Sequence, residues 1–355
     1  MTEHVAVVIV GYRCGAEIRR CIEALARSTH SAFEVHVCEN GGSDSYRALV
    51  EEISGGEHFT AAVPQPARSQ RAVQAHMSSL KEGGQSIFLH ESHDNSGYAG
   101  GINLALDVVA PDSACSAIWV LNPDTEPHRD ALAQLVEYAR DETYGIVGAR
   151  LILAETGRVQ LYGGRWRRWM ARGFNIGLDA PGDAKPDTAA IEAEMDYVSG
   201  ASMYVPRRYI EAVGPLDERY FLYNEEVDWC FRRGRYRLGY AHDAIVYHTH
   251  GVTMGSSHHK KQRSPLSVFL DERNKLLFTR RFFPREYPIV IATTLILTGQ
   301  YLAAGAFSNF FYALAGWGAG LTGRSGRPNG FPFGKPKRDP TAGSRLDDVR
   351  SSVPG

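Results

Sequence analysis

The segment Trp119-Val120-Leu121-Asn122-Pro123-Asp124-Thr125 runs an apolar stretch directly into a carboxylate at a turn. A strand that ends in this way presents Asp124 at the carboxyl edge of a sheet, where α/β folds bind ligands and where a hard cation finds oxygen ligands. Asn-Pro-Asp is also ordinary turn chemistry. The segment alone therefore predicts either a plain turn or a metal site.

Strands and helices alternate in the sequence before this segment. Helical patterns follow the apolar runs, and the expected strands are 5–10, 33–38, 87–90 and 118–121. Between about 55 and 86 the composition is polar, and we expect an insertion there that can hold a short helix. The alternation predicts an α/β fold with a doubly wound, mostly parallel sheet whose loops gather on one edge.

Length and composition set the outer limits. The 355 residues, 43% of them hydrophobic, can bury one large α/β core and an appendage. A formal net charge of -1 gives no reason to expect nucleic acid as a partner. The five cysteines contain no CxxC pair, which favours reduced thiols in the cytoplasm over a zinc site or a disulfide framework. No basic region precedes the first apolar run, so we expect a buried strand there and not a signal peptide.

Two later segments carry aromatic or acidic clusters. Residues 157–196 hold Tyr162, Trp166 and Trp169 among Gly, Arg and Pro, which favours a long surface loop near a substrate, with a packed arm as the alternative. Residues 220–233 place three acids within four positions. A helix there puts Glu225 and Asp228 on adjoining turns.

Five motifs occur in a fixed order: VIVGYRC, ENGGSD, NSGYAGGIN, LNPDT, and the pair VSGASMYVPR with GPLDERYFLYNEEVDWCFR. Together they resemble bacterial family 2 glycosyltransferases of the GT-A fold, close to the rhamnosyltransferase-like members. The resemblance covers roughly Val5 to Pro284.

The resemblance implies a site for a sugar nucleotide. The residues expected to hold the base and ribose are Val10, Gly11, Tyr12, Glu39, Asn40 and Asp44, although the family usually has Asp where Glu39 stands. Those expected in a glycine-rich turn that faces the phosphates are Asn95, Gly97, Gly100 and Asn103. This turn is not the dinucleotide pattern GxGxxG, so an oxidoreductase loses its main support.

The resemblance also implies a divalent cation. LNPDT stands at the family's DxD-like motif, so Asp124 is expected to bind Mg²⁺ or Mn²⁺, with Asn122 as a helper beside the nucleotide. His248 and His250 fall where the family often has a histidine close to the diphosphate, and His248 fits the family's spacing better. The alternative is a surface pair of histidines.

The acid cluster is expected to supply the base. Inverting transfer needs a carboxylate that takes the proton of the acceptor hydroxyl. The family places this base at Glu226, although Asp is commoner there, and Glu225 is a rival. Asp228 is the third acid. Neighbouring acids raise one another's pKa, an effect that Arg232 and Arg233 oppose.

The C-terminal third differs in composition. Residues 288–304 are apolar over about a bilayer span but contain Thr, Gly and Gln, and basic and aromatic residues precede them. We rank peripheral attachment to an anionic inner membrane first, a packed helical hairpin second and a true span third. We divide the chain into a catalytic domain at 1–255, a helical, membrane-associating region at 256–323 and a disordered tail at 324–355.

The leading hypothesis is an inverting, metal-dependent glycosyltransferase at the cytoplasmic face of the inner membrane. We expect a dTDP-rhamnose or UDP-sugar donor and a saccharide or polyprenyl-diphosphate-linked acceptor in cell-envelope polysaccharide synthesis. A non-catalytic nucleotide-sugar-binding subunit is one alternative, since Asn122, Glu39 and Glu226 depart from the commonest family residues. A nucleotidyltransferase is another, but the chain lacks a lysine- and glycine-rich triphosphate loop near its start.

Overall fold

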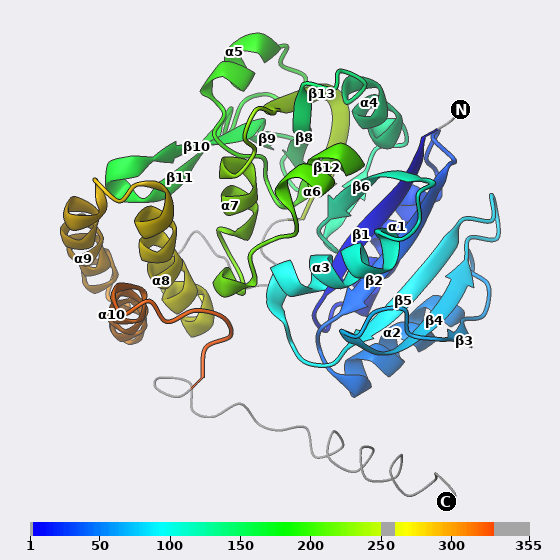
Figure 1. Cartoon of the computed structure of the whole chain (residues 1–355), viewed down its shortest axis with the longest axis horizontal. Coiled ribbons are helices and arrows are strands. Elements are labelled where there is room, and N and C mark those ends of the chain that lie inside the picture. The colour runs from blue at the N-terminus through cyan, green and yellow to red at the C-terminus, as the bar shows by residue number, and fades with distance from the viewer. Residues whose placement is uncertain (1–2, 250–259, 330–355) are drawn as a thin grey trace, which may run out of the picture.

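The computed structural model describes residues 3–249 and 260–329. Its centre is an eleven-stranded sheet, and Figure 1 shows helices on both faces of it. The strands of this sheet are β1 His4–Gly11, β2 Phe33–Glu39, β3 Val63–Gln65, β4 Ala72–Ser79, β5 Ser86–Ser92, β6 Cys115–Leu121, β7 Thr125–Pro127, β8 Tyr144–Leu153, β9 Val159–Leu161, β12 Ser202–Pro206 and β13 Arg237–His248.

The sheet has a parallel centre. Its order is β3-β4-β5-β2-β1-β6-β12-β8-β13-β7, with β9 paired to β8. Strands β5, β2, β1 and β6 are parallel neighbours, and β8 is parallel to β13. Strand β12 lies antiparallel between β6 and β8. A strand whose two faces are both covered by helices needs apolar side chains on each face. This explains the continuous apolar run of β1. The predicted α/β fold is confirmed.

Helices cover the two faces with separate apolar clusters. On one face lie α1 Gly15–Leu25, α2 Ser43–Ser54 and α4 Ala131–Tyr138. On the other lie α3 Gly97–Val109, α6 Arg207–Val213 and α7 Glu225–Phe231. The two layers leave the carboxyl ends of β2, β1 and β6 next to one another at one edge of the sheet.

The polar insertion holds strands, so the expectation of a short helix is wrong. Strand β4 pairs antiparallel with β5, and β3 pairs with β4 at the edge of the sheet. The side chains of Ala72, Ala75 and Ser78 are buried, whereas those between them are more exposed. An outer strand with one solvated face carries polar residues at alternate positions, and these concealed the strand pattern.

Residues 157–196 form the packed arm, and the expected long surface loop is wrong. The segment contains β9, β10 Gly163–Arg167, η1 Arg168–Met170, β11 Arg172–Ile176 and α5 Thr188–Glu194. Strands β10 and β11 form their own two-stranded sheet. Trp166 is buried, with its ring 4.6 Å from that of Phe278. Trp169 is exposed.

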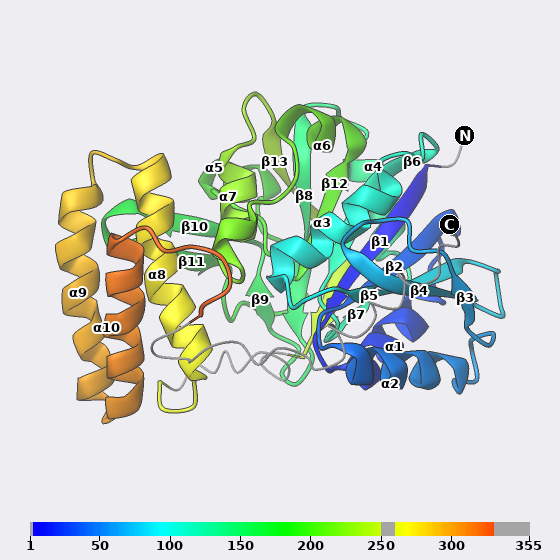
Figure 2. The ribbon, with the colours of Figure 1, turned by 60° about the horizontal axis from the view of Figure 1, so that its bottom comes forward.

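Three helices follow: α8 Pro265–Phe282, α9 Tyr287–Ala303 and α10 Phe307–Leu321. They pack together at the end of the molecule opposite β3 (Figures 1 and 2). Among the residues described, no helix has the length and apolar character needed to cross a membrane. Of the expected tail, residues 324–329 are described, and the Gly326 amide donates to the Arg219 carbonyl at 2.6 Å. Residues 330–355 and the predicted boundary near 255 lie outside the described residues.

Candidate active site

The ends of β1 and β2 form one wall of the candidate site. The Asn40 amide donates to the Gly11 carbonyl at 2.9 Å and ties the two loops together. Glu39 is fully buried, and its Oε1 accepts hydrogen bonds from the amides of Arg13 at 3.0 Å and Gly41 at 2.7 Å. Its Oε2 has no hydrogen-bond partner among the described residues. One carboxylate oxygen of Glu39 therefore shapes the loop, and the other is buried with its hydrogen-bonding capacity unused by the described residues.

The other predicted nucleotide residues of this wall differ in exposure. Val10 is buried, and Tyr12 is exposed beside Arg13, whose guanidinium lies 5.4 Å from its ring centre. Asp44, in the first turn of α2, is exposed and pairs with Arg47. Tyr12 is therefore available for stacking on a planar ligand, and Asp44 is accessible from solvent.

The glycine-rich turn requires its first glycine. Gly97 has a φ of +74°, and a Cβ atom there would lie 1.9 Å from the Phe221 carbonyl oxygen. Asn95 Oδ1 accepts from the Gly97 amide at 3.0 Å, and Asn40 Nδ2 donates to the Gly97 carbonyl at 2.9 Å. Gly100 is buried, and a Cβ atom there would meet the Ser96 side chain. The turn thus holds the end of β2 and the segment around Phe221 close together.

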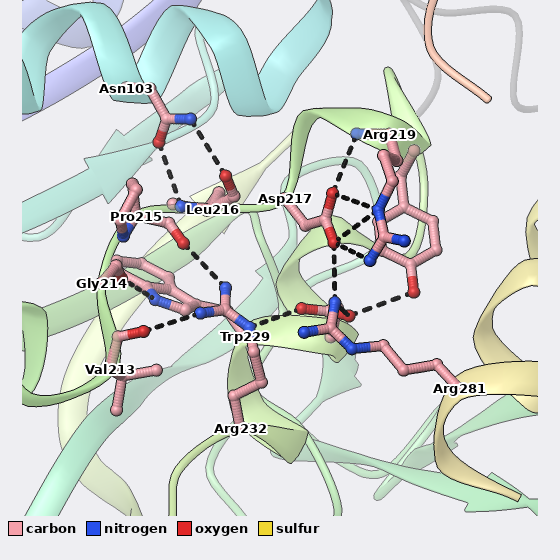
Figure 3. A network of polar contacts seen from close by, with 12 residues as sticks. Asn103, Val213, Gly214, Pro215, Leu216, Asp217, Arg219, Trp229, Arg232 and Arg281 are labelled. Carbon is pink, nitrogen blue, oxygen red and sulfur yellow. Dashed lines mark hydrogen bonds and ion pairs between the residues drawn. The ribbon is translucent and has the colours of Figure 1, made fainter.

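Asn103 uses its side-chain amide in hydrogen bonds within the fold. Its Nδ2 donates to the Leu216 carbonyl at 3.0 Å and to Glu218 at 2.7 Å, and its Oδ1 accepts from the Leu216 amide at 3.0 Å. Figure 3 shows this pairing between Asn103 and Leu216. The side chain is buried and its polar atoms are used. The assignment of Asn103 as a ligand residue is therefore corrected to a link between α3 and the segment before α7.

Asp124 and His248 lie together at the end of β6. Strand β13 pairs with β7 so that His248 is opposite Thr125. His248 Nε2 lies 3.2 Å from Asp124 Oδ1, and both side chains are buried. Asn122 accepts two hydrogen bonds from Thr125 through its backbone carbonyl, and this closes the turn. The second predicted histidine, His250, lies outside the described residues.

The side-chain atoms that Asp124 and His248 bring together fit a cation. His248 Nδ1 lies 2.7 Å from Gln160 Oε1, an oxygen that only accepts, so Nδ1 carries a proton and the lone pair of the singly protonated ring is on Nε2. Nε2 and Asp124 Oδ1 are then two acceptors at contact distance, and a proton or a cation between them relieves their repulsion. Over residues 3–249 and 260–329 no cluster of three or more His, Cys, Asp or Glu is found. Because Mg²⁺ and Mn²⁺ accept water and phosphate oxygens as further ligands, two protein ligands suffice.

Helix α7 begins with Glu225 and Glu226. Glu225 is 2% exposed, and its Oε2 has no hydrogen-bond partner in the described part of the chain. Burial, with the charge of Glu226 next, raises the pKa of Glu225 well above its usual value, against the backbone N–H groups and Arg273, which lower it. Burial also raises the pKa of Glu226. Glu226 is the more exposed of the two, so it is better placed to reach a substrate.

A turn at residues 199–201 lies between Asp124 and the acid pair Glu225 and Glu226. The Asn122 amide donates to the Ala201 carbonyl at 3.1 Å, and the Tyr98 hydroxyl donates to the Gly200 carbonyl at 2.6 Å. A Cβ atom on Gly200 would lie 3.8 Å from Glu226 Cβ. After burial, the charges of Glu225, Glu226 and Asp124 are the causes that raise the pKa of Tyr98. Asp124 and Glu226 therefore border the same turn, with Tyr98 near both.

Asp228, the third predicted acid, is a structural residue. Its side chain is fully buried, Arg232 donates to Oδ1 at 2.6 Å, and Arg281 donates to Oδ2 at 2.7 Å. Arg281 also donates to Asp217 at 2.7 Å, as Figure 3 shows. Burial raises the pKa of Asp228, against the two arginines, which lower it. Because the side chain is fully buried and each of its oxygens accepts from a guanidinium group, it does not present a free oxygen to a substrate. The catalytic assignment of Asp228 is therefore corrected: it links α7 to α8.

Helix α8 holds the segment that leads to the acids. We call residues 220–224 the acid loop. Asn274 Nδ2 donates to the carbonyls of Tyr220, Leu222 and Tyr223 at 3.1, 2.8 and 2.8 Å, and Arg273 donates to the Tyr220 carbonyl at 2.7 Å. The loop needs this support because three of its residues have left-handed φ values, namely Phe221, Tyr223 and Asn224.

Four residues of the site, Tyr98, Gln160, Arg273 and Asn274, were not predicted from the sequence. One signal was available for the last two. Residues 271–275 read Asp-Glu-Arg-Asn-Lys between the apolar runs 268–270 and 276–278. Polar side chains on every side of such a helix require polar partners. The structure shows Glu272, Arg273 and Asn274 buried.

Comparisons with known proteins identify the family of this chain. The family model described as glycosyl transferase family 2 matches residues 6–191. The low-salt glycan biosynthesis hexosyltransferase Agl10 of Haloferax volcanii is 25% identical over 247 residues, which are 67% of this chain and 76% of that protein.

Solved structures resemble the chain at low identity. GalNAc-T7, solved with UDP, GalNAc and Mn²⁺, aligns with a TM-score of 0.53 and 12% identity over 88% of this chain and 55% of its own. The mannosyltransferase PcManGT of Pyrobaculum calidifontis, solved with GDP-Man and Mn²⁺, aligns with a TM-score of 0.48 and 14% identity over 90% of this chain and 88% of its own. The likeness to GalNAc-T7 shows a shared fold.

Proposed function

Because the chain belongs to glycosyl transferase family 2, and is thus a glycosyltransferase, we propose that it transfers a hexosyl group from a nucleoside diphosphate sugar with inversion at the anomeric carbon. The observation that carries this proposal is the turn at 199–201, which Asp124 borders through Asn122 and Glu226 borders directly. A displacement with inversion needs a leaving-group side and a base side on opposite faces of one sugar.

The residues have separate roles in this proposal. Glu226 takes the proton of the acceptor hydroxyl as its oxygen attacks, and a raised pKa suits that task near neutral pH. Glu225, buried behind it, is the alternative base. Tyr98 holds the turn between the two sides through its hydrogen bond to Gly200. The donor's base and ribose lie against Tyr12 and the free oxygen of Glu39.

Asp124 and His248 would hold the divalent cation. When bound, Mg²⁺ or Mn²⁺ supplies positive charge that neutralises the leaving diphosphate. His248 is oriented for this role by Gln160, which fixes the proton on the opposite ring nitrogen. The Mn²⁺ present with GalNAc-T7 supports a divalent cation as the metal to test first.

The proposal also covers the donor and the acceptor. The name of the Haloferax relative supports a hexose and a glycan acceptor. We propose dTDP-rhamnose as the first donor to test, with UDP- and GDP-hexoses beside it, and a saccharide or polyprenyl-diphosphate-linked acceptor. A lipid-linked acceptor is accessible to an enzyme in peripheral contact with the inner face of the cell membrane.

The decisive experiment compares single variants on the donor that stabilises the chain most in a thermal-shift panel with and without Mn²⁺. We expect Asp124→Ala and Glu226→Gln each to lower transfer by about 10²-fold or more while the far-UV circular dichroism is unchanged. Glu137→Gln, an exposed acid on α4, is the matched control. Full activity of both site variants would overturn the proposal, and release of pyrophosphate in place of nucleoside diphosphate would identify a nucleotidyltransferase.

A further inference from the structure

Helix α9 has its polar and apolar sides reversed. Its 17 residues contain no charge, and the side chains it buries are Val290, Thr294, Thr298 and Tyr301. The two threonine hydroxyls donate to carbonyls of their own helix. Its exposed large side chains are Ile289, Leu295, Ile296 and Leu302. A water-facing helix normally shows the opposite arrangement, because burial of isoleucine is favourable and burial of threonine is not.

The neighbouring helix α10 continues this surface. Phe307, Phe311 and Leu321 are exposed, and α10 also contains no charged residue. Seven of the thirteen large apolar side chains exposed in the described residues lie on α9 and α10. We call these seven the apolar face. Figures 1 and 2 both place the two helices at the end of the molecule away from β3. A concentration of this kind marks a docking surface.

Cationic side chains flank the apolar face. At the start of α9 lies η1, which packs against α9 and carries Arg168 with its guanidinium 4.8 Å from the Phe283 ring. Arg285 is exposed in the link between α8 and α9. At the other end, Lys260 donates to Gln300, and the Lys261 amine lies 3.3 Å from where a Cβ atom of Gly305 would be. Trp169, 56% exposed, belongs to η1.

We propose that the apolar face docks on an anionic lipid membrane, with α9 and α10 lying along its surface and the flanking cations at the lipid headgroups. An apolar helix surface with basic and aromatic residues at its border matches the chemistry of a bilayer interface. A second copy of the chain fits less well. A symmetric dimer through this face would bring the cations at the border of one copy, which are Arg168, Arg285, Lys260 and Lys261, close to the cations at the border of the other, where like charges repel. This inference deepens the proposed peripheral location and rests on it.

The test is co-sedimentation of the full chain with vesicles of about three parts phosphatidylcholine to one part phosphatidylglycerol, and with phosphatidylcholine alone. We expect binding to the anionic vesicles that weakens with added salt. The double variant Ile296→Ser with Phe311→Ser should bind at least about ten-fold more weakly, because two exposed apolar anchors are lost. Val63→Ser removes an exposed apolar residue of β3 at the opposite end and should bind as the parent does.

A second double variant separates charge from apolar contact. Arg168→Gln with Arg285→Gln should weaken binding to the anionic vesicles by about ten-fold and leave binding to phosphatidylcholine unchanged. The inference is overturned if the parent binds neither vesicle, or if Ile296→Ser with Phe311→Ser binds as the parent does. It is also overturned if analytical ultracentrifugation shows that this variant dissociates a dimer, since a second copy would then cover the face.

A soluble-donor assay on the same samples keeps this inference apart from the proposed function. Donor turnover without vesicles should be equal in the parent and in all three surface variants, because none of the changed residues borders the turn at 199–201. A chain that binds vesicles but turns over no donor would overturn the proposed function and support the docking surface. A chain that turns over donor but binds no vesicle would support the proposed function and overturn the docking surface.

Discussion

Replacing Asn274 by alanine tests whether α8 positions the catalytic acids. The side chain is fully buried and contacts three carbonyls of the acid loop. The Tyr220 carbonyl keeps the hydrogen bond from Arg273, whereas those of Leu222 and Tyr223 lose the Asn274 amide. A buried carbonyl without a partner costs about 1–3 kcal/mol. Leu222 and Tyr223 are partly accessible to water, so water can replace part of each lost hydrogen bond. We therefore expect Asn274→Ala to lower the free energy of unfolding by about 2–4 kcal/mol.

The loss should reach the active site as well as the stability. With its carbonyls released, the acid loop can leave its left-handed conformation, which costs about 1–2 kcal/mol per non-glycine residue. Glu225 and Glu226 follow directly in the chain and would move. We therefore expect kcat to fall by about ten-fold or more in the folded variant. Asn274→Asp should be worse for stability, because it directs a carboxylate at carbonyl oxygens.

The assay combines urea unfolding with donor turnover under conditions where each variant is folded. Asn309→Ala is the matched control: Asn309 lies on α10, is buried, and donates to the carbonyls of Lys260 and Arg263 at 2.7 and 3.1 Å. It should lose similar stability, about 2 kcal/mol, and keep its kcat. The reasoning fails if Asn274→Ala stays within about 0.5 kcal/mol of the parent, or if both variants lose kcat equally.

Three further changes test other parts of the structure. Because burial raises the pKa of Glu225 above its unfolded value, the stability of the protein falls as pH rises through the folded pKa. Glu225→Gln should therefore raise the melting temperature by about 3 °C or more at about pH 8 and leave it unchanged at about pH 4. An equal effect at both pH values would contradict this. Gly97→Ala should destabilise by more than about 2 kcal/mol, whereas Gly84→Ala, with a similar φ but open space, should cost only about 1 kcal/mol in urea unfolding. Trp166→Ala should cost about 3–5 kcal/mol by calorimetry and Trp169→Ala under about 0.5 kcal/mol; similar losses would refute the packed arm.

The strand ends of the site could be predicted because they depend on local pattern. The apolar runs of β1, β2 and β6 end at polar turns, and parallel neighbours bring those turns to one edge. Asp124 and His248 were expected from a resemblance, and β13 pairs with β7 in a register that brings them together. The metal role itself stays a prediction.

The errors arose where a side chain's partner is distant in sequence. Asp228 looked like a candidate base in the acid cluster, but Arg281, which holds it, is 53 residues away. Asn103 belonged to a motif expected at the phosphates, yet its partner Leu216 is 113 residues away. No spacing rule relates such positions, because the contacts depend on how helices from different layers meet. The same applies to Asn274, whose carbonyl partners precede it by 51–54 residues.

The hold of α8 on the acid loop also has a consequence for biosynthesis. The ribosome makes the loop before it makes Arg273 and Asn274, and the hydrogen bond from Arg273 to the Gly326 carbonyl forms later still. Until then the nascent chain has a nearly complete sheet, but its left-handed loop lacks the hydrogen bonds that α8 donates to Tyr220, Leu222 and Tyr223. Domains fold as units during synthesis, so the α/β layers can form early. The enzyme would therefore gain its acids in working order only as the last helices emerge, which delays sugar transfer until the surface proposed to dock on the membrane is also in place.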